Sequence, residues 1–456
     1  MDWNAFRQQA HTAIDDICDY YLSLEKHQVL SKVEPGYLQK LLPREAPVES
    51  ESFDQVRKDV FKFIMPGITH WQHPSFFAYY PSNSSPAGIL AELYSNMFNC
   101  IGFNWACSPA YTELETIVLD WLCKALKLSP DFLSSGKGCG VIQGSASEAL
   151  LTCLLGARKY QLQKGHSIDK LVFYCSDQTH TSGQKASNIA LTKLRVIETN
   201  TKGQMTATAL EEAILQDIDA GLVPCFCVGT FGTTTSGAID DLDGLGVICE
   251  KYDIWYHIDA AYAGSFLVLD SFECPTDKAD SFNMNTHKFL LTNFDCSPLF
   301  LKDRSKVVDA LSISAPYYRN KQSESGLVTD FRDLQIPLGR RFRSLKLWFV
   351  MRLYGITKIQ AHVQTHLDFA KYIEAKVIEE PKLELAVARN FALVTFKHVE
   401  GKTKELYNLI IKENVYLTMS HFNGEDIIRF VPGTLQTKKL HVEAFWEIVK
   451  RSINTV

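Results

Sequence analysis

The sequence predicts an α/β fold in which a mostly parallel sheet is followed by a smaller α+β unit. Short apolar segments alternate with helical patterns between about residues 86 and 355, which is typical of a sheet covered on both faces. Beyond about residue 356 the order becomes helix, strand, strand, helix. Before that sheet, apolar side chains recur at helical spacing. We therefore expect three units, at residues 1–85, 86–355 and 356–456.

The N-terminal unit is expected to be helical. One face of an amphipathic helix is formed by Trp3, Phe6, Ala10, Ala13, Ile14, Ile17 and Tyr21. A second helical stretch covers residues 53–64, and the pair Pro66-Gly67 ends it. The aromatic segment that follows, from Trp71 to Pro81, is expected to form either core or the wall of a pocket.

The central unit contains short apolar segments that we interpret as strands. They cover residues 140–142, 171–174, 194–197, 223–228, 254–258 and 298–301. Because ligands bind beyond the strand ends of such sheets, the loops after these strands are where chemistry is expected. In the C-terminal unit we expect helices at residues 361–375 and 440–453, and strands at residues 393–396 and 427–430.

The composition is that of an ordinary globular protein, since 46% of the 456 residues are hydrophobic and 22% are charged. The net charge of −5 provides no basic field for a nucleic acid. The basic cluster at residues 340–346 is interpreted as the polar start of a helix. No apolar stretch is long enough to span a membrane, and the first residues do not resemble a signal peptide. We expect a cytoplasmic protein that binds neither nucleic acid nor membrane.

The 12 cysteines are scattered and form no Cys-x-x-Cys pair, so they are interpreted as reduced and mostly buried thiols. Cys225 and Cys227 are expected to share one face of a strand, where packing explains them better than metal binding. His70 and His73 have the spacing of a ligand pair but lack cysteine partners. A bound metal is therefore not implied.

A phosphate site is predicted after the first strand of the sheet. Ser145 and Glu148 have the spacing of a capping box at the start of an apolar helix. A helix N-terminus favours an anion, although simple capping also explains the motif. The hydroxyl-rich turn at residues 229–235 would suit phosphate oxygens as well. NAD is disfavoured, because the glycines at positions 136, 138 and 140 precede the strand that a dinucleotide fingerprint must follow.

Three further side chains complete a constellation. His180 follows a strand, where it either covers a flat ring or lies at the surface. Asp259 ends an apolar strand, and a buried carboxylate persists only with a cationic partner, such as a pyridinium nitrogen, or with strong hydrogen bonds. Lys288 has apolar neighbours that would lower the pKa of its amine and free it as a nucleophile. Together with the phosphate loop, these residues indicate a site for pyridoxal phosphate.

Long motifs strengthen this interpretation. They lie at residues 33–38, 101–115, 140–149, 258–265 and 335–344. Through them the chain resembles the pyridoxal phosphate-dependent group II decarboxylases, in particular those that act on aromatic L-amino acids, over nearly its whole length. The resemblance implies the fold-type I, aspartate aminotransferase-like fold, with a mostly parallel seven-stranded sheet and a smaller C-terminal α+β domain. It also implies a homodimer whose active sites lie at the subunit interface.

The resemblance assigns roles residue by residue. Lys288 corresponds to the lysine that binds the cofactor, Asp259 to the partner of the ring nitrogen, His180 to the stacking imidazole and Ala261 to the small residue beneath the ring. The phosphate would lie on Ala146, Ser147, Thr234, Asn285 and His287. The substrate would be received by Trp71, Tyr79, Tyr80, Pro81, Ser82, Ile101, Phe103 and Gly339.

The resemblance also predicts the reaction. Residues 311–326 correspond to a mobile lid, and Tyr318 to the lid tyrosine that protonates the substrate α-carbon after carbon dioxide leaves. Related aldehyde synthases commonly carry Phe in place of this tyrosine or Asn in place of the histidine, so Tyr318 and His180 favour simple decarboxylation to an amine. Gly339 leaves room for large rings, which favours tryptophan, 5-hydroxytryptophan and dopa. An aromatic acetaldehyde synthase and a histidine or tyrosine decarboxylase are the alternatives.

Three residues depart from the family pattern. Thr286 stands where Pro usually precedes the His-Lys pair, which leaves the rigidity of the lysine loop open. Tyr80 stands where Phe is common, and Ser82 replaces a frequent Thr. These last two residues leave the preference for ring substituents open.

Overall fold

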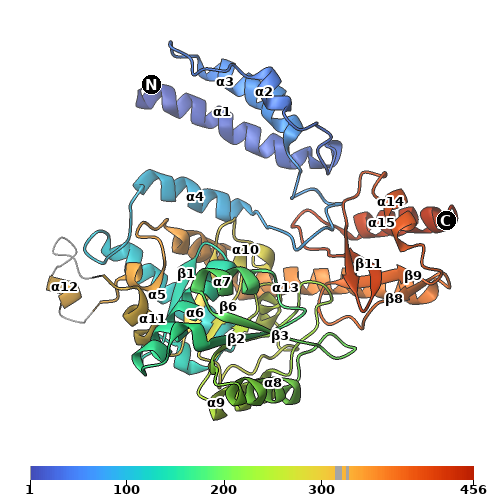
Figure 1. Cartoon of the computed structure of the whole chain (residues 1–456). Coiled ribbons are helices and arrows are strands. Elements are labelled where there is room, and N and C mark those ends of the chain that lie inside the picture. Colours follow the sequence, from blue (N-terminus) through green and yellow to red (C-terminus); the bar gives the residue numbers. More distant parts are fainter. Residues whose placement is uncertain (1, 314–320, 325–327) are drawn as a thin grey trace.

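The computed structural model describes residues 2–313, 321–324 and 328–456 (Figure 1). Its centre is a seven-stranded sheet with the order β1-β7-β6-β5-β4-β2-β3. The strands are β1 (Cys139–Gln143), β2 (Leu171–Ser176), β3 (Lys193–Ile197), β4 (Val223–Thr230), β5 (Trp255–Asp259), β6 (Ser281–Asn283) and β7 (Ser297–Leu301). β7 runs antiparallel to both of its neighbours, and the other neighbouring pairs are parallel. The predicted mostly parallel sheet is thus confirmed.

Helices cover both faces of this sheet, which explains why its strands are apolar on both sides. One face packs against α6 (Ala146–Gln163), α7 (Ser182–Ala190) and α11 (Ser305–Leu311). The opposite face packs against α5 (Pro109–Ala125), α8 (Ala207–Asp219), α9 (Leu242–Lys251) and the first half of α13 (Arg343–Glu379). The result is a sheet enclosed between two helical layers.

The expectation that Cys225 and Cys227 share one face is wrong. The pairing of β2 with β4 shifts register, because Val172 lies opposite Pro224 whereas Phe173 lies opposite Phe226. Cys225 is the extra residue of this bulge and packs on the α6 side, whereas Cys227 packs on the α9 side. Both thiols are buried, as predicted.

A second, antiparallel sheet with the order β10-β11-β9-β8 lies in the C-terminal part. Its strands are β8 (Leu383–Leu385), β9 (Val394–His398), β10 (Thr418–Phe422) and β11 (Glu425–Phe430), and its helices are α14 (Thr403–Ile410) and α15 (Lys439–Ile453). The long helix α13 connects the two sheets and bends at Gly355, whose φ of 65° lies in the left-handed region. One hydrophobic cluster continues from the large sheet into this smaller one.

The N-terminal helices lie at the periphery (blue in Figure 1). They are α1 (Trp3–Leu22), α2 (Tyr37–Leu41), α3 (Phe53–Asp59), with a wider turn at Val60–Ile64, and α4 (Pro86–Phe98). The Asp2 carboxylate caps α1 by accepting from the N–H groups of Asn4 and Ala5, each at 2.8 Å. The predicted apolar face of α1 stays uncovered in the single chain: α1 contains no buried residue, and Trp3 is 81% exposed.

Short helices occupy several connections. They are α10 (Thr286–Phe289), α12 (Lys321–Glu324) and the 3₁₀ turns Leu24–Lys26, Met65–Gly67, Pro130–Phe132, Ile168–Lys170, Ala263–Val268 and Phe331–Leu334. Among the described residues, no helix is both long and apolar enough to cross a membrane.

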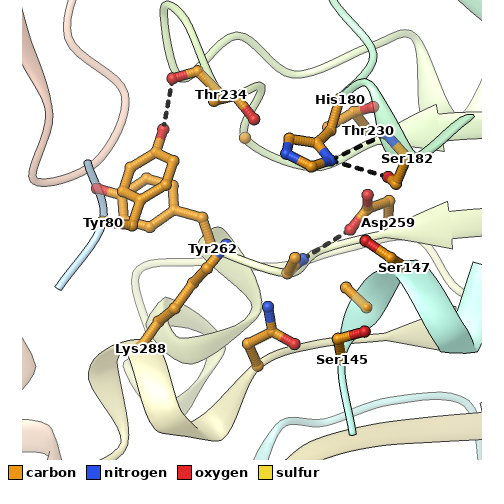
Figure 2. A pocket seen from close by; sticks show the side chains of 14 residues that line it. Tyr80, Ser145, Ser147, His180, Ser182, Thr230, Thr234, Asp259, Tyr262 and Lys288 are labelled. Atoms are coloured by element: carbon orange, nitrogen blue, oxygen red, sulfur yellow. Dashed lines mark hydrogen bonds between the residues drawn. The ribbon is translucent and has the colours of Figure 1, made fainter. Parts of the chain in front are cut away.

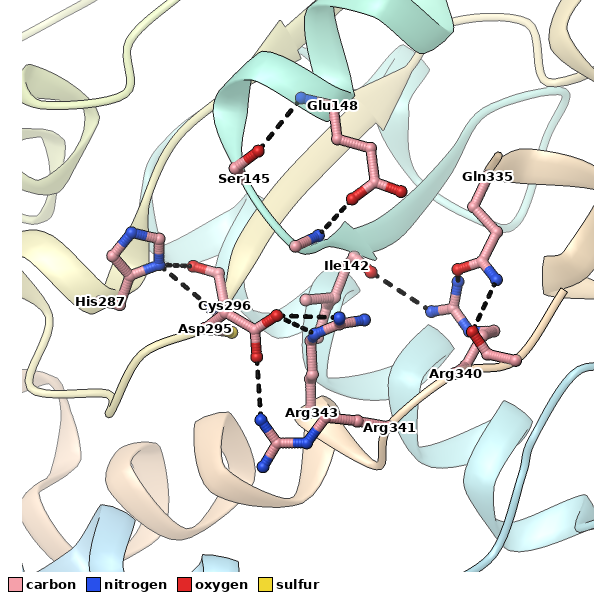
Figure 3. A network of polar contacts seen from close by, with 12 residues as sticks. Ile142, Ser145, Glu148, His287, Asp295, Cys296, Gln335, Arg340, Arg341 and Arg343 are labelled. Atoms are coloured by element: carbon pink, nitrogen blue, oxygen red, sulfur yellow. Dashed lines mark hydrogen bonds and ion pairs between the residues drawn. The ribbon is translucent and has the colours of Figure 1, made fainter. Parts of the chain in front are cut away.

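The basic cluster at residues 340–346 is more buried than a solvated helix start. α13 does begin at Arg343, but the Arg340 side chain is fully buried against Glu115. It also bonds to Gln335 and to the Ile142 carbonyl (Figure 3). Lys346 is also buried, with its Nζ 2.6 Å from Oε1 of Glu92. These ion pairs connect the start of α13 to α4 and α5.

Candidate active site

The loops that follow β1, β2, β4, β5 and β6 meet at one edge of the sheet and enclose a pocket (Figure 2). These five strands are parallel, so their carboxyl ends lie at the same edge. The pocket is lined by Tyr80, Ser145, Ala146, Ser147, His180, Ser182, Thr230, Gly232, Thr234, Asp259, Ala261, Tyr262, Asn285 and Lys288.

The N-terminus of α6 forms one side of the pocket. Ser145 caps the helix by accepting from the Glu148 N–H at 3.2 Å. The Glu148 carboxylate accepts from the Gly144 N–H at 2.9 Å, one residue earlier than in a standard capping box (Figure 3). Ala146 and Ser147 line the pocket from the first turn, where backbone N–H groups have no acceptor within the helix. This end of the pocket favours an anion.

Asn285 and Thr234 line the same pocket. Ser297 donates its hydroxyl to Oδ1 of Asn285 at 2.7 Å, so the amide oxygen is occupied and the NH₂ group remains a donor. Thr234 supplies a hydroxyl from the turn after β4. Both side chains therefore add polar groups that can bind phosphate oxygens.

Asp259 lies at the end of β5 and is 6% exposed. Its Oδ1 accepts from the Ala261 N–H at 2.9 Å and from the Asn283 amide at 3.5 Å. Among the described residues, no side chain or backbone group donates to Oδ2. This oxygen is therefore available to a cationic ligand in the pocket.

The ring of His180 has a defined tautomer. The Ser182 N–H donates to Nδ1 of His180 at 3.2 Å, so Nδ1 is an acceptor and the proton of the neutral ring lies on Nε2. The Ser182 hydroxyl lies 2.9 Å from the same nitrogen (Figure 2). Desolvation lowers the pKa of His180, the Asp259 carboxylate opposes this effect, and the Lys288 cation adds to it.

Lys288 lies in α10, within the connection between β6 and β7. Burial, the largest cause, and the nearby Arg429 cation lower its pKa to about 8, although Asp259 acts in the opposite direction. Nζ lies 5.2 Å from the centroid of the Tyr80 ring. A substantial fraction of this amine is therefore neutral and nucleophilic near neutral pH.

The loop around Lys288 is held by the segment that follows the aromatic residues. Asn83 donates its N–H to the His287 carbonyl at 2.7 Å and its side-chain amide to the Lys288 carbonyl. Ser85 donates its hydroxyl to the Leu291 carbonyl at 2.7 Å. Residues 83–85, named the clamp segment below, thus fix the backbone that carries the lysine.

The Thr286 hydroxyl adds two hydrogen bonds to this loop. It donates to the Cys296 carbonyl at 3.1 Å and accepts from the Thr292 hydroxyl at 2.9 Å. All three residues are buried. The side chain therefore connects the start of α10 to the residues just before β7.

Tyr80 is the one predicted substrate residue that lines the pocket. Its ring stacks on Tyr262 with a centroid distance of 3.7 Å, and its hydroxyl donates to the carbonyls of Thr233 and Thr234 at 3.0 and 3.2 Å. Trp71 stacks on Tyr79 at 5.5 Å outside the pocket. The other predicted substrate residues do not line it either: Pro81, Ser82, Ile101, Phe103 and Gly339.

His287 is a further prediction that the structure places elsewhere. It is buried but does not line the pocket. Its Nδ1 accepts from the Cys296 N–H at 3.0 Å, and its ring packs edge-on against Phe294. Burial lowers its pKa to about 4. Tyr318 lies outside the described residues.

Two lining residues, Ser182 and Tyr262, were missed by sequence reasoning, whereas Thr230 and Gly232 lie in the predicted turn at residues 229–235. Both missed residues had a usable signal, because Ser182 is two residues from His180 and Tyr262 is next to Ala261. The buried Oγ1 of Thr230 has no hydrogen-bond partner among the described residues. An orphaned hydroxyl that lines a pocket indicates a ligand.

No group of three or more His, Cys, Asp or Glu side chains that could hold a metal ion occurs in the described part of the chain. His70 instead lies with Nδ1 2.9 Å from the Tyr20 hydroxyl, and Nδ1 of His73 accepts from the Ser75 N–H.

Comparison with known proteins identifies the family. The profile of the pyridoxal-dependent decarboxylase conserved domain matches residues 35–399. The chain is 44% identical to tryptophan decarboxylase 2 of Oryza sativa subsp. japonica, across 99% of this chain and 95% of that protein. It is 46% identical to phenylacetaldehyde synthase of Arabidopsis thaliana, across 99% of this chain and 96% of that protein. The crystal structure of Oryza sativa TDC with PLP and tryptamine matches with a TM-score of 0.98 and 36% identity, covering 100% of this chain and 99% of that one.

The pocket fits pyridoxal phosphate in the chemistry of its donors. The free N–H groups of α6 suit the phosphate, the free oxygen of Asp259 suits a protonated ring nitrogen, and the amine of Lys288 suits the aldehyde. Ala261 adds only a methyl group to the same wall. The chain therefore belongs to the pyridoxal-dependent decarboxylase family, and pyridoxal phosphate is its cofactor.

Proposed function

We propose that this protein converts aromatic L-amino acids into arylalkylamines and carbon dioxide. The observation that carries this proposal is the meeting of Lys288, Asp259 and His180 in one pocket, beside the stacked rings of Tyr80 and Tyr262. Relatives named tryptophan decarboxylase, and a related structure with tryptamine, support an aromatic substrate. Tryptophan, 5-hydroxytryptophan and dopa are the proposed substrates, with phenylalanine and tyrosine as further candidates.

The pocket residues take distinct roles in this proposal. Pyridoxal phosphate, when bound, supplies a ring that accepts the electron pair left as carbon dioxide departs. The N-terminus of α6 and Thr234 bind the phosphate. Asp259 keeps the ring nitrogen protonated, His180 orients the ring and holds a proton at Nε2, and Lys288 supplies the amine. Tyr318 is the proposed proton donor to the substrate α-carbon.

We further propose that the active enzyme is a homodimer with its sites at the subunit interface. Ile101 is 59% exposed and lies close to Gly339, yet neither residue lines the pocket of its own chain. The apolar face of α1 is likewise uncovered. Burial of these surfaces by a second copy would remove the exposed apolar area and bring the missing substrate residues to the pocket. Sedimentation of the purified protein tests this state, and a stable, active monomer would contradict it.

An aromatic acetaldehyde synthase is the second candidate, because the chain is 46% identical to one. His180 and Tyr318 favour the amine. The test is to incubate the purified protein and pyridoxal phosphate with tryptophan, 5-hydroxytryptophan, dopa, phenylalanine, tyrosine and histidine, and to measure amine, aldehyde and peroxide together. Amine without peroxide supports the proposal, and the preferred acid names the substrate. Aldehyde with stoichiometric peroxide would favour the synthase, and turnover of histidine alone would refute an aromatic preference based on Gly339.

A further inference from the structure

A chain of hydrogen bonds runs beneath the pocket to Asp259. Nε1 of Trp255 lies 2.8 Å from Oγ of Ser281, and that hydroxyl lies 2.7 Å from Nδ1 of His257. Nε2 of His257 lies 2.7 Å from Oδ1 of Asn283, whose amide nitrogen lies 3.5 Å from Oδ1 of Asp259. The first four residues lie on β5 and β6 and are at most 5% exposed.

The direction of every hydrogen bond in this chain follows from its last member. The Asp259 carboxylate can only accept, so Asn283 turns its NH₂ group toward Asp259 and its Oδ1 toward His257. Nε2 of His257 therefore carries the proton of the neutral ring, and Nδ1 accepts from the Ser281 hydroxyl. Ser281 in turn accepts from the indole of Trp255, which can only donate. The donor at the far end of the chain thus matches the tautomer of the imidazole and the orientation of the amide.

His257 stays neutral over the working range, since burial lowers its pKa to about 4. A protonated ring would donate from both nitrogens, so the Ser281 hydroxyl would have to turn its own proton away from the ring. The other titratable groups that act on Asp259 are His180 and Lys288, and both face it from the pocket side. Besides the Ala261 N–H, which donates to Oδ1 at 2.9 Å, the four buried residues act on the carboxylate from behind.

We propose that Trp255, Ser281, His257 and Asn283 are positioning residues that direct a hydrogen-bond donor onto Asp259. This donor keeps the second oxygen of the carboxylate turned toward the cofactor. If the chain reversed, the Asn283 oxygen would face the carboxylate, and the repulsion between the oxygens would turn the carboxylate away from the ring nitrogen. A displaced partner could not hold the ring nitrogen in its protonated form. The proposal rests on the role assigned to Asp259 in the proposed function.

The test uses the full-length protein loaded with pyridoxal phosphate that is isotopically labelled at the ring nitrogen. NMR then reports the pH at which this nitrogen loses its proton, and equilibrium titration of the cofactor-free protein gives the cofactor affinity. We compare Asn283→Leu, Ser281→Ala and Trp255→Phe. Asn283→Leu should weaken cofactor affinity about tenfold and let the ring nitrogen lose its proton at lower pH. Ser281→Ala should weaken affinity about threefold, and Trp255→Phe should have the smallest effect, because each is further from Asp259.

The unfolding midpoint separates a positioning role from a merely structural one. With a merely structural role, the variant that is destabilised most would also change the ring nitrogen most. Trp255 is the largest of the three side chains, so Trp255→Phe should lower the unfolding midpoint most while changing the ring nitrogen least. Ser344→Ala is the matched control, because it also removes a fully buried serine hydroxyl, one without a partner among the described residues. Ser281→Ala removes only a hydroxyl group, so the result does not depend on a bulky replacement folding.

Asp259→Asn separates the two possible failures. If this variant shifts the titration of the ring nitrogen but Asn283→Leu and Ser281→Ala leave it as in the wild type, the positioning proposal is overturned and the role of Asp259 stands. If Asp259→Asn itself leaves the ring nitrogen protonated, the role of Asp259 in the proposed function fails.

Discussion

Replacing Thr286 tests how the lysine loop is held. The Thr286 hydroxyl is bonded to both the Cys296 carbonyl and the Thr292 hydroxyl, and all of these groups are buried. Thr286→Val keeps the volume of the side chain but leaves both partners unsatisfied. At about 1–3 kcal/mol for each unsatisfied buried group, reduced by partial relaxation, we expect a loss of about 2–4 kcal/mol in the free energy of unfolding.

Two other replacements at Thr286 sharpen this test. Thr286→Ser keeps the hydroxyl and should remain within about 1 kcal/mol of the wild type. Thr286→Pro introduces the residue usual in the family, and the backbone accepts it, because Asn285 is extended (φ −108°, ψ 99°) and position 286 opens α10. The proline variant also lacks the hydroxyl, so it should be less stable than the wild type. It should still be more stable than the valine variant by about 0.4–1 kcal/mol, because proline reduces the conformational entropy of the unfolded chain.

The assay is urea unfolding of the cofactor-free proteins, followed by titration with pyridoxal phosphate. The expected order of stability is wild type and Thr286→Ser, then Thr286→Pro, then Thr286→Val. The reasoning would be refuted by a valine variant as stable as the wild type, since the two buried hydrogen bonds would then contribute nothing.

Three further predictions concern the pocket and its support. The rate at which the cofactor-free protein captures pyridoxal phosphate should rise with pH and level off above about 8. The reason is that the pKa of Lys288 is lowered to about 8 and that only the neutral amine reacts. A midpoint near the usual pKa of lysine would contradict this. Tyr80→Phe should keep the stacking on Tyr262 but lose the hydrogen bonds from the hydroxyl to the turn at residues 233–234. A fluorescence titration should therefore show that this variant binds the cofactor about two- to tenfold more weakly. Unchanged affinity would mean that these hydrogen bonds do not support the cofactor site. Arg340→Met should cost about 3–5 kcal/mol of unfolding free energy, because it leaves the buried Glu115 carboxylate without its cationic partner. Adding Glu115→Leu should restore part of this free energy. A double variant as unstable as the single one would disprove the coupling between the two residues.

The parts of the fold that the sequence predicted are those with a long, regular pattern. The apolar runs of β1, β2, β4 and β5 and the helix α15 were predicted at nearly their observed positions. β6 was missed because its three residues, Ser281–Asn283, carry two polar side chains that bond to buried partners rather than to water. The bulge at Cys225 depends on the register of a neighbouring strand, which no local pattern records.

The site shows the same division. His180 and Asp259 could be placed because each lies at the end of a recognisable strand, and parallel strands bring their ends to one edge. Lys288 follows the missed β6 and was identified by its apolar neighbours and by the family resemblance. The groups that surround these residues could not be predicted, because their positions depend on contacts between distant segments of the chain. Asn83 reaches the loop of Lys288 across about 200 residues, and the compensation for Thr286 comes from Thr292 and Cys296.

The clamp segment has a consequence for how substrate preference can change in this family. The clamp segment begins three residues after Tyr80, and its hydrogen bonds fix the backbone of Lys288. An inserted or deleted residue near Tyr80 would therefore displace the nucleophilic amine as well as the ring that it was meant to adjust. New specificities should arise by exchange of side chains at constant chain length in this segment, whereas length variation remains open to loops that do not touch α10. For enzyme engineering, residues 83–85 define a boundary up to which loop grafting can proceed without rebuilding the lysine loop.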